Sequence, residues 1–217
     1  MAEFAIIGLG RFGRSLALSL ARERRSVLVI DADPGEVQKI SAEMDSAICA
    51  DTTDELALRE LGLEKMSCIV VAIGAQSMEA SILTTALLRQ IGVPMIVARA
   101  VTELHERVLR TVGAHMVVNP EAVMGHRLAL QLAQPNVLER FDLGENTEIA
   151  EIDVPAAFAG KTPIELDLRR KYGISVVALR RGKTVRAVID GTEEFHSGDA
   201  VVVIGSPTAI RRIAAMA

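Results

Sequence analysis

One short segment near the start of the chain constrains its fold more than any other feature. It follows an apolar run, opens a stretch with helical spacing, and reads Gly8, Leu9, Gly10, Arg11, Phe12 and Gly13. In such a loop the first glycine permits a tight turn, the second lets the backbone approach a pyrophosphate, and the third lets helix and strand pack closely. Phosphate is then held by the free N–H groups of the helix N-terminus. The segment predicts a strand, a loop and a helix that bind a nucleotide.

A carboxylate follows this loop at the spacing of about 20 residues at which such units place a ribose ligand. The second apolar run ends in Asp31, and Asp33 lies in the turn behind it. We expect Asp31 to accept hydrogen bonds from ribose hydroxyls, and its charge would repel the 2′-phosphate of NADP. Asp33 is a second candidate contact in the same turn. The alternative for Asp31 is a solvated acid at the end of a strand.

Further candidate contacts lie in the loop and at the ends of later strands. Arg11 stands where dehydrogenases usually carry a small or apolar residue, and its guanidinium would fork onto phosphate oxygens. The alternative for Arg11 is an exposed surface arginine. Ligands of open α/β sheets lie at the carboxyl ends of the strands. Asp51, Thr52 and Gly74 stand at such ends and are candidate adenosine contacts. The equal alternative is a helix cap at Asp51-Thr52 and a turn glycine at Gly74. Arg99 ends the fifth strand and is a weaker candidate.

Apolar runs alternate with amphipathic, helix-length segments over residues 1–135. The runs are short and almost continuously apolar, as expected of a parallel sheet that helices cover on both faces. Strands are expected at residues 3–8, 26–30, 47–50, 68–73, 95–99 and 115–118. Six strands separated by helices predict an α/β fold with a Rossmann-like, doubly wound parallel sheet. A last helix over 120–134 ends at Gln134-Pro135-Asn136, where we place the domain boundary.

The remaining residues, 136–217, predict a small α+β domain. Helical turns are expected at 163–171, a closing helix from Pro207, and strands at 147–154, 174–179, 184–188 and 200–204. A domain of this size buries a modest share of its surface, so pairing with a second copy would stabilise it.

The composition narrows the classes of partner. Hydrophobic residues make up 50% of the 217 residues, and the net charge is −4. The chain has no long basic stripe of the kind that nucleic-acid binding needs. No apolar run approaches the ~18 residues of a membrane span, and the first residues read as a strand rather than a signal peptide. We therefore expect a cytoplasmic protein, without a nucleic-acid partner, that buries its apolar excess in strands and subunit contacts.

No cluster of residues in the sequence predicts catalysis, so we expect no enzyme. The four histidines show neither metal-ligand spacing nor a serine partner in a nucleophile elbow. Cys49 and Cys68 lie in apolar runs and predict small buried side chains. The alternative is an NAD-dependent oxidoreductase, which needs a general acid or base in a substrate pocket. Residues 136–217 hold a single histidine and no Tyr-x-x-x-Lys pair.

The chain resembles the RCK (regulator of conductance of potassium) family, most closely its KtrA/TrkA-type regulatory subunits of bacterial potassium uptake systems. The motifs that carry the resemblance span the chain: GLGRFG at 8–13, VIDAD at 29–33, ADTTDE at 50–55, VVAIGA at 70–75, LTTALL at 83–88, NPEAVMG at 119–125 and FHSGDAVVVIGS at 195–206. The glycine loop alone occurs in many dehydrogenases, whereas its combination with the last two motifs is far more specific.

The resemblance implies an RCK N-terminal domain, an RCK C-terminal domain, and homodimers that assemble into a homo-octameric ring. The ring would lie at the inner face of the membrane, beneath a membrane-embedded potassium transporter subunit of the KtrB/TrkH type. ATP and ADP would compete for the glycine loop and change the shape of the ring, with NAD(H) as the alternative ligand. Arg11 would reach the terminal phosphates and Asp31 would hold the ribose. Regulation of another cation transporter differs only in the partner and stays open.

The resemblance also implies two further sites. Glu121 matches a family glutamate that helps bind a divalent cation, Mg²⁺ or Ca²⁺, between subunits. The alternative for Glu121 is an acidic residue without a ligand, which the helix dipole favours in the first turn of a helix. Residues 167–174, which include Arg169, match the stretch of the second domain that binds cyclic di-AMP in several relatives. The alternative for Arg169 and Arg170 is a solvated helix end.

Overall fold

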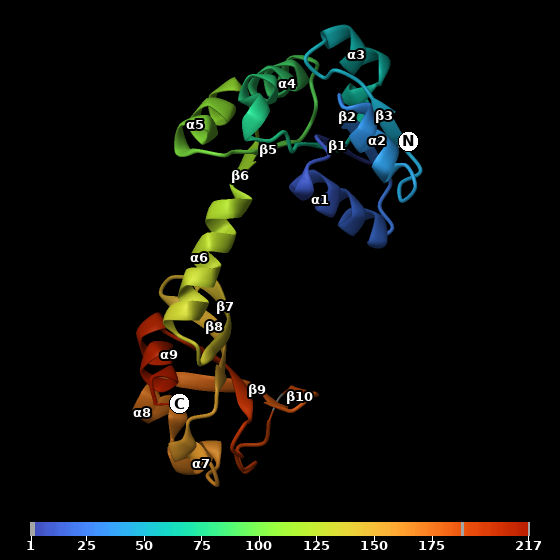
Figure 1. Ribbon diagram of the computed structural model, residues 1–217. Helices are drawn as coiled ribbons and strands as arrows, with labels where there is room; N and C mark the ends of the chain where they lie inside the picture. The colour runs from blue at the N-terminus through green and yellow to red at the C-terminus, as the bar shows by residue number, and fades with distance from the viewer. Residues whose placement is uncertain (1–2, 188, 217) are drawn as a thin grey trace. The chain divides into compact units, whose positions relative to one another are not determined.

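The computed structural model describes residues 3–187 and 189–216 (Figure 1). Contacts divide the chain into two compact units, Met1–Met124 and Gly125–Ala217. The division falls inside helix α6 (Pro120–Ala133), whereas the sequence places the domain boundary after this helix, between residues 135 and 136. Since α6 leaves one unit and enters the other, its assignment to the first domain stays a prediction.

A six-stranded parallel sheet forms the centre of the first unit. Its strands are β1 (Phe4–Ile7), β2 (Val27–Asp31), β3 (Ala47–Cys49), β4 (Cys68–Val71), β5 (Ile96–Arg99) and β6 (Met116–Val118). The strand order is β3-β2-β1-β4-β5-β6, so the direction of winding reverses between β1 and β4. Open α/β sheets bind their ligands at such a switch point, outside the carboxyl ends of the strands. The predicted Rossmann-like, doubly wound sheet is confirmed.

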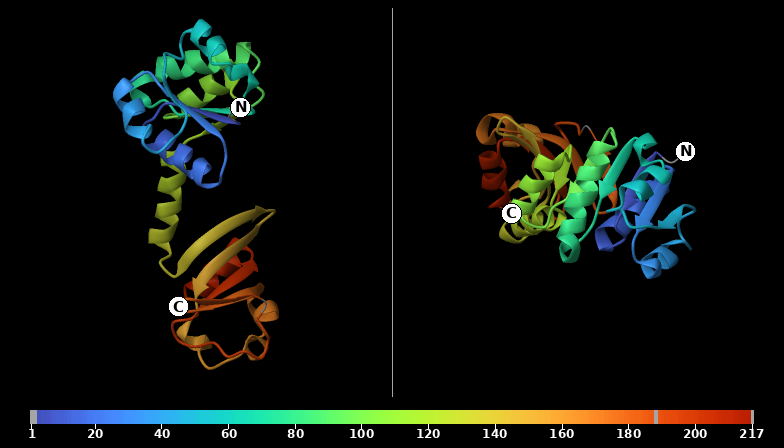
Figure 2. Two further views of the ribbon diagram at one scale, coloured as in Figure 1. Left: turned by 90° about the vertical axis from the view of Figure 1, so that its right-hand side faces the viewer. Right: turned by 90° about the horizontal axis from the view of Figure 1, so that it is seen from above.

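Helices cover both faces of this sheet (Figure 2). They are α1 (Arg11–Arg22), α2 (Pro34–Ile40), α3 (Glu55–Glu60), α4 (Met78–Gln90) and α5 (Glu103–Val112), with 3₁₀ turns η1 (Leu63–Lys65) and η2 (Ala75–Ser77). Successive side chains of a strand point to opposite faces. Ile7 of β1 belongs to the same buried cluster as Leu88 of α4, whereas Ile6 belongs to the cluster of Ala17 of α1 and Ile40 of α2. The nearly continuous apolar runs follow from this two-sided burial.

A five-stranded antiparallel sheet forms the second unit, in the order β10-β9-β11-β8-β7. Its strands are β7 (Val137–Gly144), β8 (Thr147–Asp153), β9 (Ile174–Arg181), β10 (Thr184–Ala187) and β11 (Ala200–Gly205). Its helices are η3 (Ala156–Phe158), α7 (Pro163–Leu166), α8 (Leu168–Tyr172) and α9 (Pro207–Ala214). Ile210 and Ile213 of α9 share a buried cluster with Ile152 of β8 and Val203 of β11. The predicted small α+β domain is confirmed.

The carboxylate of Asp199 ties the loop before β11 to strand β9. It accepts two hydrogen bonds from the Arg181 guanidinium, at 2.9 Å from Nε and 2.8 Å from Nη2. The backbone amide of His196 donates a third at 2.8 Å. Asp199 is only 2% exposed, and its pKa is lowered because Arg181 stabilises the ionised carboxylate. These bonds give the FHSGD motif a structural role in closing its loop.

The structure differs from the sequence-based expectations at strand β7 and at the two cysteines. Strand β7 is absent from those expectations, because it lies at a sheet edge and its second half, Phe141 to Gly144, is exposed and partly polar. Cys49 is exposed rather than buried, since β3 is the edge strand of its sheet, and Cys68 is half-buried. Val188, the expected end of the strand at 184–188, lies outside the described residues.

Candidate nucleotide-binding site

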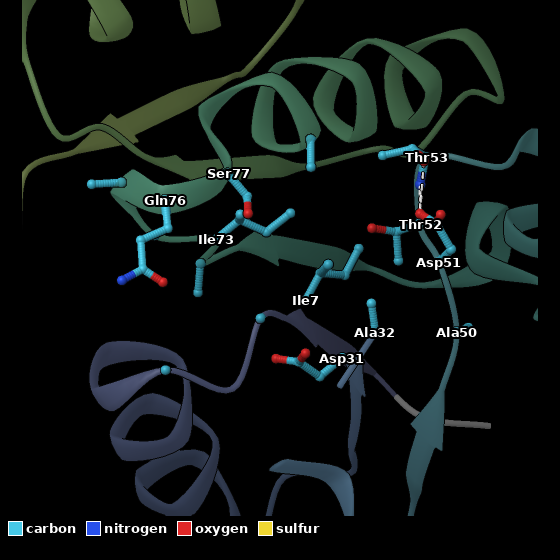
Figure 3. A pocket seen from close by; sticks show the side chains of 16 residues that line it. Ile7, Asp31, Ala32, Ala50, Asp51, Thr52, Thr53, Ile73, Gln76 and Ser77 are labelled. Atoms are coloured by element: carbon cyan, nitrogen blue, oxygen red, sulfur yellow. Dashed lines mark hydrogen bonds between the residues drawn. The ribbon is translucent and has the colours of Figure 1, made fainter. Parts of the chain in front are cut away.

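A cavity of about 470 Å³ opens at the switch point between β1 and β4 (Figure 3). Small-molecule sites have volumes of roughly 300–1,000 Å³. The cavity is lined by residues at the carboxyl ends of β1, β2, β3 and β4 and in the segments that follow: Ile7, Gly8, Gly10, Asp31, Ala32, Ala50, Asp51, Thr52, Thr53, Ala72, Ile73, Gly74, Ala75, Gln76, Ser77 and Ala80. The fold thus brings together six residues that the sequence predicts as contacts, namely Gly8, Gly10, Asp31, Asp51, Thr52 and Gly74.

The three glycines of the loop meet different spatial demands. Gly8 has a φ of +95°, and a Cβ atom there would lie 2.9 Å from the backbone nitrogen of Ile73. A Cβ atom on Gly13 would lie 1.9 Å from the carbonyl oxygen of Gly8. A Cβ atom on Gly10 would meet no heavy atom of the described residues within 4 Å. Gly8 and Gly13 are therefore required by the fold itself, whereas the space beside Gly10 is open to a ligand.

Helix α1 presents its N-terminus to this loop. Its N-cap residue is Gly10, so no side chain caps the first N–H groups, and the first turn contains no acidic residue. The free N–H groups and the helix dipole favour an anion at such an end. Arg11, the first residue of α1, is exposed and lies outside the cavity lining. Phe12 and Gly13 also lie outside the lining, so contacts of these three residues with a ligand stay predictions.

Asp31 holds the glycine loop by direct hydrogen bonds. Its Oδ2 atom accepts from the backbone amide of Leu9 at 2.6 Å, and its Oδ1 atom accepts from the backbone amide of Asp33 at 2.9 Å. A carboxylate offers about four lone-pair positions, so acceptor capacity remains for ribose hydroxyls. Figure 3 shows Asp31 at the cavity, with Gln76 and Ser77 on the far side of it. Asp31 is therefore held in place by two backbone amides, and its contact with a ribose stays a prediction.

Asp51 and Thr52 are held by partners of their own. The Oδ1 atom of Asp51 accepts from the backbone amide of Thr53 at 2.9 Å and from its hydroxyl at 2.7 Å. These bonds lower the pKa of Asp51, because they favour the ionised carboxylate. Thr52 is buried, and its hydroxyl lies 2.8 Å from the hydroxyl of Thr84 on α4. The carboxylate of Asp51 therefore stays ionised at neutral pH, and the residue lines the cavity.

Asp33 has a role in the fold that the sequence reading did not assign to it. It is the N-cap of α2, and its Oδ1 atom accepts from the backbone amide of Gly35 at 2.7 Å. It lies outside the cavity lining. A contact between Asp33 and a nucleotide stays a prediction.

Arg99 and Glu121, two candidates predicted for different ligands, form an ion pair with each other. The Nη2 atom of Arg99 donates to the Oε1 atom of Glu121 in the first turn of α6. The Arg99 side chain is 15% exposed and that of Glu121 is 62% exposed. Neither residue lines the cavity, but the Arg99 guanidinium is a neighbour of Gly74, which does. A cation at Glu121 would have to replace Arg99 as its partner.

Three polar residues of the loops that follow β3 and β4 were not predicted from the sequence. Thr53, Gln76 and Ser77 line the cavity with polar side chains but were not predicted as contacts. The available signal was the ADTTDE and VVAIGA motifs, since each ends a strand and continues into a polar loop. The rule that ligands lie beyond the carboxyl ends of strands extends to these loop residues.

Residues 3–187 and 189–216 contain no group of three or more His, Cys, Asp or Glu side chains arranged to hold a metal ion. Within the same ranges, no helix has the length and apolar character needed to cross a membrane.

Two known domain families match this chain. Residues 4–120 match the TrkA-N domain, and residues 148–217 match the TrkA-C domain. The chain belongs to the TrkA-N family. Ktr system potassium uptake protein C of Bacillus subtilis (strain 168) is 41% identical over 210 residues, which cover 97% of this chain and 95% of that protein. The resemblance to KtrA/TrkA-type members of the RCK family is confirmed.

Solved structures agree with this TrkA-N family assignment. The GsuK RCK domain has a TM-score of 0.55 and 25% sequence identity, over 98% of this chain and 46% of that chain. The GsuK bound to ADP has a TM-score of 0.51 and 28% identity, over 59% of this chain and 33% of that chain. This chain therefore spans less than half the length of either solved chain.

Proposed function

We propose that the chain is a nucleotide-binding regulatory subunit of a potassium uptake system and that it has no catalytic activity. The observation that carries the proposal is the match along 97% of this chain to a protein named for potassium uptake in the Ktr system. The cavity at the switch point of the first sheet supplies the ligand site. The chain would act at the cytoplasmic face of the membrane, bound to a membrane-embedded potassium transporter subunit.

The ligand we propose is an adenine nucleotide, ATP or ADP. The open space beside Gly10 and the uncapped N-terminus of α1 suit phosphate groups. The remaining lone pairs of Asp31 suit a ribose. A related structure, the GsuK bound to ADP, supports this ligand class. NAD(H) is the alternative, and cyclic di-AMP at residues 167–174 of the second unit is a separate proposal.

The assembly we propose is a homodimer that forms an octameric ring. Helix α6 has no buried residue, although it carries apolar side chains. Val123, Met124, Leu128 and Leu132 of this helix are between 51% and 74% exposed. Apolar surface of this kind on a helix is typical of contacts with another chain. A net charge of −4 supports a protein partner rather than a nucleic acid.

Calorimetry of the purified chain against ATP, ADP, NADH and cyclic di-AMP tests the ligand. We expect ATP and ADP to bind, and we expect Gly10→Val to abolish binding while the far-ultraviolet circular dichroism stays unchanged. Gly125→Val is the matched control, because a Cβ atom there also meets nothing within 4 Å but lies outside the cavity lining. Failure of all four ligands to bind the folded chain would overturn the proposal.

Measurements of potassium flux test separately whether the partner is a potassium transporter subunit. A Ktr-type membrane subunit in liposomes should carry potassium at a rate that depends on addition of this chain and on the nucleotide supplied. An unchanged flux on adding the chain, with nucleotide binding intact, would leave a nucleotide sensor that serves another transporter.

A further inference from the structure

Arg99 lies between the glycine loop and the first turn of α6. Its Nη1 atom is 3.8 Å from the position that a Cβ atom on Gly74 would take, at the cavity lining. Its Cζ atom lies 6.0 Å from the centre of the Phe12 ring, next to Arg11 in the glycine loop. On its other side the guanidinium donates to Glu121. One cationic group thus lies beside the rim of the nucleotide cavity and is hydrogen-bonded to α6 at the same time.

The guanidinium of Arg99 has donors that the described residues leave unused. Its Nη2 atom donates to Glu121, whereas its Nε atom is buried and has no hydrogen-bond partner in residues 3–187 and 189–216. An arginine carries five N–H donors. Buried donors in folded proteins nearly always have an acceptor, and an unpaired one lowers stability. This deficit points to an acceptor that a ligand supplies.

The two partners of the ion pair differ in their access to water. The Glu121 side chain is 62% exposed, so its carboxylate regains water when the pair opens. The Arg99 side chain is 15% exposed and needs another acceptor in place of Glu121. A phosphate oxygen is a strong acceptor for a guanidinium and suits its fork of donors. Exchange of Glu121 for phosphate therefore satisfies Arg99 without burying an unpaired carboxylate.

We propose that Arg99 reads the phosphates of the bound nucleotide and that Glu121 competes with them for its guanidinium. The inference rests on the proposed nucleotide site and names a specificity residue within it. Nucleotide binding would release the first turn of α6 from β5, and a carboxylate freed in this way becomes available to a cation. By linkage, anything that draws Glu121 away from Arg99 must strengthen nucleotide binding by the same factor.

The test is a double-mutant cycle measured by calorimetry in EDTA, with adenosine, AMP, ADP and ATP as ligands. Glu121→Gln should tighten the phosphate-bearing ligands by about three- to tenfold and leave adenosine unchanged, because it removes the competing charge. In an Arg99→Ala background the same substitution should have no effect. Glu106→Gln is the charge-matched control, since Glu106 pairs with Arg110 on α5. If Arg99→Ala lowers the melting temperature strongly, Arg99→Met retains the aliphatic stem beside Phe12.

The outcomes separate this inference from the proposed function. Nucleotide binding by the parent with affinities that Glu121→Gln leaves unchanged or weakens would overturn the competition and leave the nucleotide site standing. Equal tightening with and without Arg99, or in Glu106→Gln, would show a general charge effect and would also overturn it. A parent chain that binds none of the four ligands would overturn both.

Discussion

The carboxylate of Asp31, at the end of β2, accepts a hydrogen bond of 2.6 Å from the backbone amide of Leu9 in the glycine loop. A second bond, from the amide of Asp33, fixes its other oxygen. The residue that the sequence predicts as a ribose ligand therefore also shapes the loop that would hold the phosphates. A ribose bound at Asp31 would therefore be coupled to the geometry of the glycine loop through one side chain.

Asp31→Ala should weaken ATP binding and lower the free energy of unfolding by about 1–2 kcal/mol, because two amide donors lose a charged acceptor. It should also remove any preference for ATP over 2′-deoxy-ATP, as expected if Asp31 contacts the ribose. Calorimetry and denaturant unfolding measure both effects. The control is Asp54→Ala, which removes the cap of α3, where Asp54 accepts from Leu56 at 2.9 Å. A preference for ATP that survives in Asp31→Ala would assign the ribose to other residues.

Arg11→Ala should weaken ATP more than ADP. Arg11 is the exposed first residue of α1, from which a guanidinium can reach a terminal phosphate while the ribose and adenine contacts remain. A difference of about tenfold between the two losses is expected for one charge-assisted contact. Arg22→Ala, at the exposed last turn of the same helix, should leave both affinities unchanged. Equal losses for the two nucleotides would place Arg11 away from the terminal phosphate.

Mg²⁺ or Ca²⁺ should raise the melting temperature of the ATP-bound protein, and Glu121→Gln should remove this increase. A carboxylate is a suitable ligand for these cations, but a single one binds weakly unless a second subunit adds another. The ATP-bound state is required because Arg99 otherwise occupies Glu121. Thermal melting with and without the cation, beside the Glu106→Gln control, measures the effect. Identical melting of the parent under both conditions ends the cation proposal.

Asp199→Asn should destabilise the second unit by about 2–3 kcal/mol at pH 7, because Arg181 loses a buried, charged acceptor. The folded-state pKa of Asp199 is lowered, so its contribution to stability is fully present above the unfolded value of about 3.9. That contribution is lost as pH falls through the lower folded-state value. Denaturant unfolding between pH 7 and pH 2.5 should show the difference between parent and variant shrinking at acid pH. A difference that stays constant over this range would mean that Asp199 acts without its charge.

The elements of the first unit could be predicted closely from the sequence. Each of its strands lies within the expected range except β2, which ends one residue later, at Asp31, because a parallel sheet buried on both faces requires short, continuous apolar runs. The loop geometry was also predictable, since Gly8 and Gly13 have neighbours that exclude a side chain. The apolar runs and the glycine spacing are local features of the sequence, so they predict structure without knowledge of the fold.

The remaining features depend on contacts between distant parts of the chain. Arg99 and Glu121 were predicted for separate ligands, and the pairing of β5 with β6, which sets Arg99 opposite Val118, brings them together. The bond between Asp199 and Arg181 likewise joins neighbouring strands of an antiparallel sheet. The exposure of Cys49 follows from the edge position of β3, which strand order alone determines.

We expect nucleotide exchange in the first unit to change the shape of a multimer. A ligand shifts an assembly between two states only through different affinities for them, so ATP and ADP must favour different forms. Small-angle scattering of the ATP-bound and ADP-bound protein, with light scattering for the mass, measures this directly. We expect a mass several times 23.3 kDa and two distinct scattering curves. A monomer at micromolar concentration, or superimposable curves for the two nucleotides, would contradict it.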